Sequence, residues 1–142
     1  MKDSLVVGIS TSLKILVDKD RTIAFMGDKG RVYATPSMVL DIEYVARNWL
    51  MEYLDEGEDT VGTHVSVDHV AATVEGDTVE IIITVKELNG RAIMMTTHVK
   101  DSIEVVGTGN HNRFVVDKSK ERLIELHKKF LPKPNRSLKC LR

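Results

Sequence analysis

Three residues of the kinds used in acyl transfer stand in the first half of the chain. Thr35 supplies a hydroxyl, Glu43 a carboxylate and His69 an imidazole. A hydroxyl can attack a carbonyl carbon, an imidazole can move the proton, and a carboxylate can orient or stabilise the imidazole. Backbone amides at a helix N-terminus can hold the oxyanion that forms. Together these parts indicate an acyl-transfer site.

Each of the three residues also has an ordinary structural interpretation. Thr35 precedes Pro36 and can cap a helix. Glu43 can extend from the edge of an apolar stripe to solvent, and His69 can be a hydrogen-bonded, half-buried strand residue. Thr35 and Glu43 are eight residues apart, which is ~12 Å along one helix. A bend at Thr35 or a partner chain would therefore have to bring the groups together.

Gly62 and Arg113 are two further candidates for the same site. Gly62 precedes an apolar strand, where it either allows close approach of the backbone or forms a bulge. Arg113 lies on a predicted strand, where it pairs with Glu43, binds a phosphate or is simply exposed. The remaining histidines on the predicted strands lack carboxylate neighbours at metal-ligand spacing, so the sequence predicts no metal site.

Hydrophobic periodicity predicts the helix that must carry Thr35 and Glu43. Apolar residues recur every three or four positions over residues 35–54, which is typical of an amphipathic helix, and Gly57 supplies its stop. The polar residues expected outside the apolar stripe of the helix are Asp41, Arg47, Asn48 and Glu52.

The apolar runs within residues 5–25 predict one or two strands, with a break at residues 18–21.

The periodicity changes to two over residues 61–117, which predicts consecutive strands. Asn89 and Gly90 form a strong hairpin signal. The connections are too short for crossover helices, so the strands are expected to be antiparallel. A last helix is predicted over residues 118–130. The first strand of the series is expected to place on one face Val61, Thr63, Val65, Val67 and His69.

This order of elements predicts an α+β fold in which a curled antiparallel sheet wraps a long central helix. A sheet of this kind leaves its edge strands open, and pairing with a second copy of the chain would cover them. We expect a single domain over residues 1–142, in which residues 118–142 are a C-terminal helix and basic tail.

Composition excludes several other classes of protein. The net charge is −1, with 11 basic and 19 acidic residues up to Asp117 and 9 basic and 2 acidic from Lys118 onward. Because the basic tail holds one aromatic residue, it predicts a solvated helix end rather than nucleic-acid binding. One cysteine, Cys140, excludes a disulfide framework within the chain. No apolar run approaches the ~20 residues of a membrane helix, and no secretory signal opens the chain, so a cytoplasmic setting is expected.

The run VSVDHVAATVEGDTVEI (residues 65–81) resembles the hot-dog fold thioesterases, and most closely the fluoroacetyl-CoA thioesterase-like family. The resemblance extends to residues 1–3, to the helix with Glu43 in its second turn, and to GTGNHNRFVVDKSK (residues 107–120). It implies a hot-dog fold and a homodimer with acyl-CoA sites at the subunit interface. It also implies hydrolysis of a short- or medium-chain acyl-CoA to free acid and CoA, without a metal or further cofactor.

The same resemblance assigns roles to the candidate residues. Thr35, Glu43 and His69 match the family's catalytic residues. Gly62 matches a glycine near the thioester carbonyl, and Arg113 an arginine beside the glutamate or at the dimer site. The attacking group is Thr35, Glu43 or water.

Two alternatives share the fold: a non-catalytic acyl-CoA binding module and a hydratase or dehydratase.

The family has an aromatic lid before its threonine, whereas residues 27–33 hold a single aromatic residue, Tyr33, so fluoroacetyl selectivity is not expected.

Overall fold

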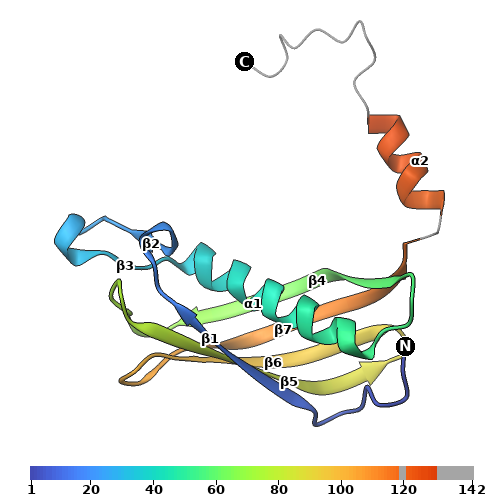
Figure 1. The fold of residues 1–142 in the computed structure, drawn as a ribbon, viewed down its shortest axis with the longest axis horizontal. Helices are drawn as coiled ribbons and strands as arrows, with labels where there is room; N and C mark the ends of the chain where they lie inside the picture. The colour runs from blue at the N-terminus through green and yellow to red at the C-terminus, as the bar shows by residue number, and fades with distance from the viewer. Residues whose placement is uncertain (119–120, 131–142) are drawn as a thin grey trace, which may run out of the picture.

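The computed structural model describes residues 1–118 and 121–130. One long helix, α1 (Thr35–Leu50), lies along one face of a curved, five-stranded antiparallel sheet (Figure 1). A two-stranded ribbon precedes α1, and α2 (Glu121–Phe130) follows the sheet. The ribbon strands are β2 (Thr22–Ile23) and β3 (Val32–Tyr33). The sheet strands, in spatial order, are β1 (Ser10–Leu16), β5 (Thr78–Asn89), β6 (Ala92–Lys100), β7 (Val105–Asp117) and β4 (Glu58–His69).

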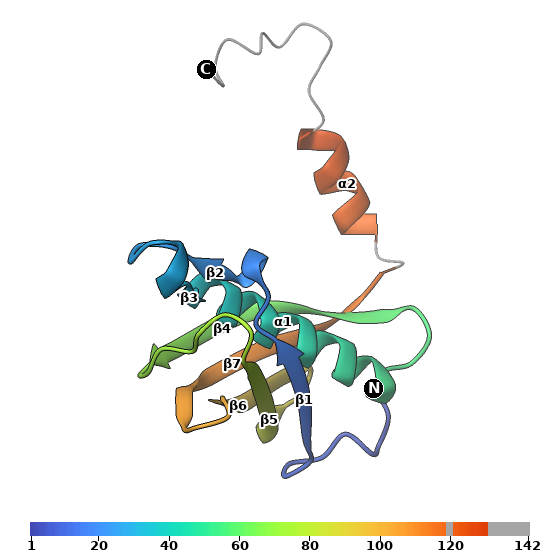
Figure 2. The same ribbon diagram turned by 60° about the vertical axis from the view of Figure 1, so that its left-hand side comes forward.

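The predicted α+β arrangement of a sheet curled around one helix is confirmed. Figure 2 shows the sheet bending around α1, with β1 crossing beside the helix. Each neighbouring pair of strands in the sheet is antiparallel, and β5 and β6 form the hairpin that Asn89 and Gly90 predicted. In the described part of the chain, β1 and β4 each have one strand neighbour, so both are sheet edges.

The apolar stripe of α1 packs on the concave face of the sheet. Met38, Ile42 and Leu50 are almost fully buried, and they share one core cluster with Ile81 and Met95 of the sheet. Burial of such side chains stabilises the fold by roughly 1.5–3 kcal/mol each. The helix is thereby held at a fixed position above the strands.

The start of α1 corrects two predictions. Thr35 is not the helix cap: Ala34 occupies that position, without a side-chain hydrogen bond, and Thr35 is the first helical residue. Asp41, expected on the solvent side, is 6% exposed. Its direction lies about 40° from that of Val45, at ~100° per residue, so it belongs to the buried flank.

The end of α1 lies four residues before the predicted one. The helix stops at Leu50 and continues as a 3₁₀ turn, Met51–Tyr53. Gly57 then adopts a φ of 85°, a conformation that favours glycine, where the chain turns into β4. The stop signal was therefore correct in kind but lies beyond the last α-helical turn.

The predicted alternation in β4 is wrong in its first half. The strand begins at Glu58 and has a register shift between Gly62 and His64. This bulge breaks the period of two, so Val61 is 44% exposed and Thr63 is exposed, whereas His69 is partly buried. The bulge interpretation of Gly62 is confirmed.

Three other boundaries differ from the predictions. Residues 5–9 lie outside β1, and the expected break is a 3₁₀ turn, Lys19–Arg21. The last helix begins at Glu121 rather than at residue 118. Most of the basic tail, including Cys140, lies outside the described residues. None of the helices in the described ranges is long and apolar enough to span a membrane.

Candidate active site

The hydroxyl of Thr35 and the imidazole of His69 meet at the N-terminus of α1. Thr35 Oγ1 and His69 Nδ1 are 2.7 Å apart, although the residues are 34 positions apart in sequence. His69 ends β4, and the next residue, Val70, donates its amide to the carbonyl of Val106 on β7. The sheet thus fixes the histidine, and the helix fixes the threonine. Both line a cavity of about 340 Å³, whose other lining residues are Ile23, Val32, Tyr33, Val70, Ala71 and Ala72.

The surroundings of His69 favour the neutral imidazole. Burial lowers the pKa of His69 below its ordinary value, because a cation is poorly solvated there. Nε2 of the ring is buried and has no hydrogen-bond partner among the described residues. Nδ1 is therefore the ring nitrogen that makes the hydrogen bond with Thr35 Oγ1.

A second group of side chains surrounds Gly62. A Cβ atom at Gly62 would lie 3.2 Å from Glu43 Oε1, 3.4 Å from Arg113 Nη1 and 3.5 Å from the His111 ring. The missing side chain lets a carboxylate, a guanidinium and an imidazole approach the same stretch of backbone. The sequence predicted the proximity of Arg113 and Glu43 as one of three alternatives, and Arg113 is 6% exposed rather than on the surface.

Arg113 is held rigidly in this group. Its Nε donates to Thr60 Oγ1 at 2.7 Å and its Nη2 to the Thr60 carbonyl at 2.9 Å. Nη1 donates to His111 Nε2 at 3.2 Å, so Nδ1 of that ring carries the proton and donates to the His64 carbonyl at 2.8 Å. Burial lowers the pKa of His111, and the ring is neutral. His111 was considered in the sequence only as a metal ligand.

Glu43 is separate from the Thr35–His69 pair within one chain. No hydrogen bond or ion pair joins its carboxylate to either residue in the part of the chain that the structure describes. Glu43 and Thr35 nevertheless line one open, largely apolar cavity of about 580 Å³, together with Pro36, Val39 and Leu40. Thr35 and Glu43 therefore border the same depression on α1.

Sequence reasoning missed a buried polar group behind His69. Tyr33 is 1% exposed, and its hydroxyl donates to Asp41 Oδ2 at 2.6 Å. Arg21 Nε lies 3.0 Å from the same oxygen. The rings of Tyr33 and His69 meet edge to face, with centroids 6.3 Å apart. The direction of Asp41 on the helix, close to that of Val45, was the one signal that could have found this group.

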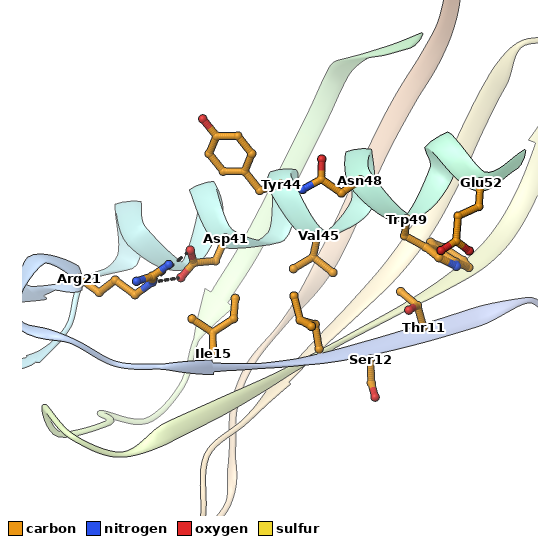
Figure 3. Close-up of a pocket in the computed structure, with 11 residues that line it drawn as sticks. Thr11, Ser12, Ile15, Arg21, Asp41, Tyr44, Val45, Asn48, Trp49 and Glu52 are labelled. Atoms are coloured by element: carbon orange, nitrogen blue, oxygen red, sulfur yellow. Dashed lines mark hydrogen bonds and ion pairs between the residues drawn. The ribbon is translucent and has the colours of Figure 1, made fainter. Parts of the chain in front are cut away.

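Figure 3 shows a groove on the flank of α1 that carries Asp41. It has a volume of about 490 Å³ and runs between α1 and β1, with the Arg21–Asp41 ion pair at one end. Asp41 and Glu43 are two residues apart, hence about 200° apart around the helix. The groove and the Glu43 carboxylate thus lie on different flanks of α1.

Comparison with known proteins shows the family of this chain. A family model described as fluoroacetyl-CoA-specific thioesterase matches residues 17–119. The chain belongs to this family. A fluoroacetyl-CoA thioesterase from Streptantibioticus cattleyicolor is 28% identical over 123 residues, which cover 82% of this chain and 88% of that protein.

Solved structures that are similar to this chain confirm the hot-dog fold. A fluoroacetyl-CoA thioesterase has a TM-score of 0.80 at 26% identity, covering 92% of this chain and 100% of that one. A thioesterase superfamily member from Thermus thermophilus has a TM-score of 0.78 at 23% identity, covering 88% and 93%. A hot-dog-like protein from Thermanaerovibrio acidaminovorans reaches 0.77 at 22% identity, covering 89% and 94%.

Proposed function

We propose that this protein hydrolyses short- or medium-chain acyl-CoA thioesters to the free acid and CoA. The observation that carries the proposal is the 2.7 Å contact between Thr35 Oγ1 and His69 Nδ1 at a helix N-terminus. A hydroxyl paired with an imidazole beside free backbone amides is what acyl transfer requires. Membership of the fluoroacetyl-CoA-specific thioesterase family supports the same reaction.

In the proposed reaction, His69 Nδ1 takes the proton of the Thr35 hydroxyl as its oxygen attacks the thioester carbonyl. The amides of Thr35 and Ser37, which precede the first helical hydrogen bond, stabilise the oxyanion. The CoA thiolate leaves with the proton from His69, and a water molecule then hydrolyses the acyl-threonine with the same imidazole as base. No cofactor is needed, because a thiolate is a good leaving group.

The geometry favours Thr35 over water as the first nucleophile. Nδ1 of His69 is hydrogen-bonded to Thr35 Oγ1, and Nε2 is buried. Neither ring nitrogen is therefore accessible to a water molecule in the free protein. Glu43 remains the other candidate, since its carboxylate has no hydrogen-bond partner among the described residues. We assign it instead to stabilising the imidazolium that forms during attack.

This role for Glu43 requires a homodimer. β4 is an open sheet edge, and two β4 strands can pair antiparallel about a twofold axis. An axis near Val65 and Ser66 would put Gly62 of one protomer opposite the partner's His69. The half-site of Glu43, Gly62 and Arg113 would then face the partner's Thr35–His69 pair.

A cytoplasmic setting of the protein stays a prediction.

A panel of acyl-CoAs of increasing chain length, read by release of free thiol, tests the activity. We expect saturable thiol release with short or medium chains. Tight binding of acyl-CoA without thiol release would instead identify a binding module. Hydration of an enoyl-CoA without thiol release would identify a hydratase. Either result would overturn the hydrolase assignment.

The pH dependence of kcat/KM should reflect the neutral state of His69. Because burial lowers the pKa of His69, the imidazole stays an effective base below its ordinary pKa of ~6.5. We expect kcat/KM to remain on its plateau at that pH and to fall only at lower pH, as His69 takes up a proton. A profile from about pH 4.5 to 9 checks this. A midpoint of the acid limb above ~6.5 would contradict it and would mean that the carboxylate of Glu43 outweighs burial in setting the pKa of His69.

Gly62→Ala should lower activity without unfolding the protein. The new Cβ would lie 3.2 Å from Glu43 Oε1, so this carboxylate must shift by a few tenths of an ångström, whereas Arg113 Nη1 at 3.4 Å is in ordinary contact. Since misplacement on the scale of an ångström costs up to about 10²-fold, we expect kcat/KM to fall about tenfold. Gly90→Ala, at the remote hairpin, is the control: its φ of 59° strains an alanine, so Tm should fall while kcat/KM of the folded protein stays unchanged. Unchanged kcat/KM in Gly62→Ala would mean that this half-site takes no part in the reaction.

A further inference from the structure

The orientation of His69 within one protomer is not set by a carboxylate. In a Ser-His-Asp site the acid holds the imidazole in its working orientation. Here Thr35 makes a hydrogen bond with Nδ1, the backbone of Ala71 also interacts with the imidazole, and the buried Nε2 has no side-chain partner among the described residues. The structure offers a different support for the ring, namely the edge-to-face contact with Tyr33.

We propose that Arg21, Asp41 and Tyr33 form a positioning network that fixes the imidazole of His69 toward Thr35. The catalytic meaning of this network rests on the thioesterase function proposed above. Asp41 accepts from Tyr33 Oη at 2.6 Å and from Arg21 Nε at 3.0 Å. Tyr33 in turn meets the His69 ring with an interplanar angle of 74°. The three residues act through His69 and do not themselves contact the reacting atoms.

The burial of Asp41 makes both of its hydrogen-bond donors necessary. A carboxylate that is 6% exposed in the middle of a helix is stable only when strong donors compensate its desolvation. Arg21 and Tyr33 are those donors. Burial raises the pKa of Tyr33, and the adjacent carboxylate raises it further, so the phenol remains a proton donor. The hydrogen bond to Asp41 raises the pKa of Arg21, which stays charged.

Backbone contacts connect the network to the catalytic threonine. Tyr33 N donates to the Thr73 carbonyl at 2.8 Å, and Ala34 N donates to the Arg21 carbonyl at 2.9 Å. Thr35 follows directly, as the first residue of α1. The segment that presents the hydroxyl is therefore anchored by the residues that support the imidazole, and a shift in one shifts the distance between the reacting groups.

The ion pair also lies where the protein surface can be reached. Arg21 and Asp41 form the end of the groove between α1 and β1 in Figure 3, and Arg21 is 32% exposed. Tyr33 is 1% exposed, so the network runs from the groove wall into the core beside His69. Tyr33→Phe is therefore a clean test of the network. The substitution removes only the hydroxyl that joins the Tyr33 ring to Asp41.

For Tyr33→Phe we expect kcat to fall about tenfold with little change in KM. The aromatic ring at residue 33 is retained, but Asp41 no longer holds it against the His69 imidazole. Asp41→Asn keeps an amide oxygen that can accept from Tyr33, so it should retain more activity than Asp41→Ala. The control is Glu58→Gln, another buried acid, 8% exposed and paired with Arg91, at the far end of β4. It should lower Tm without changing kcat of the folded protein.

The imidazole of His69 supplies a readout that does not require catalytic turnover. Nitrogen NMR of the His69 imidazole, assigned by its loss in His69→Ala, reports tautomer and pKa in the free protein. We expect Tyr33→Phe and Asp41→Ala to shift these signals and Glu58→Gln to leave them unchanged. His69 signals and kcat equal to wild type in Tyr33→Phe would overturn the network. If the wild type released no thiol, the proposed function would fail, and the NMR comparison would still decide the network.

Discussion

His69→Ala is expected to lower kcat about 10³-fold while the protein remains folded, because removal of a general acid and base costs 10²- to 10⁴-fold. His69 is the one imidazole in hydrogen-bond contact with Thr35 among the described residues. Without it the hydroxyl has no base, and the leaving thiolate has no proton donor. The measurement is single-turnover and steady-state thiol release with the best acyl-CoA of the panel.

The matched control for this variant is His98→Ala. His98 is exposed on β6, between the buried residues Thr97 and Val99, so its side chain points away from α1. We expect kcat within about twofold of wild type for this variant, since it touches no part of the site. Tm of both variants should be measured, because loss of fold in His69→Ala would also abolish activity. A folded His69→Ala with wild-type turnover would remove this histidine from the mechanism.

The sequence was sufficient to predict the scaffold of the site where packing follows a simple period. The stripe on α1 and the alternation in β5 and β6 both reflect burial against one layer, so each could be read without knowing the partner element. The register of the sheet could not be read in this way. β1 pairs with β5, which is more than sixty residues later, and no local pattern specifies that partner.

The sequence named candidate residues for the site, but it gave their geometry only in part. Thr35, Gly62 and His69 were chosen from chemistry and a family resemblance, and their role in catalysis stays a prediction. The bulge after Gly62 and the capping of α1 by Ala34 depend on neighbouring elements, so they became visible only in the structure. Asp41 shows the same limit, since a carboxylate in a helix suggests solvent until its donors, which are distant in sequence, are known.

Mixing two inactive variants should restore activity if the catalytic groups come from different protomers. Suppose that Glu43 acts on the partner subunit's His69. A dimer of one Glu43→Gln chain and one His69→Ala chain then carries both defects in one site and none in the other. One of the two sites in each mixed dimer is intact, so we expect about half of wild-type kcat per site in the isolated mixed dimer, and about a quarter in an unseparated, randomly paired mixture. Co-expression with two affinity tags isolates the mixed dimer for measurement.

The control for this experiment uses two residues that meet within one chain. Thr35 Oγ1 and His69 Nδ1 are 2.7 Å apart within a single protomer, so the control mixes a Thr35→Val chain with a His69→Ala chain. Because both groups come from one chain, each protomer of that mixed dimer has a broken pair, and no recovery is expected. Recovery with Glu43→Gln but not with Thr35→Val would support a site divided between subunits at β4. Failure of both mixtures would mean that Glu43 serves its own chain or has no part in the reaction.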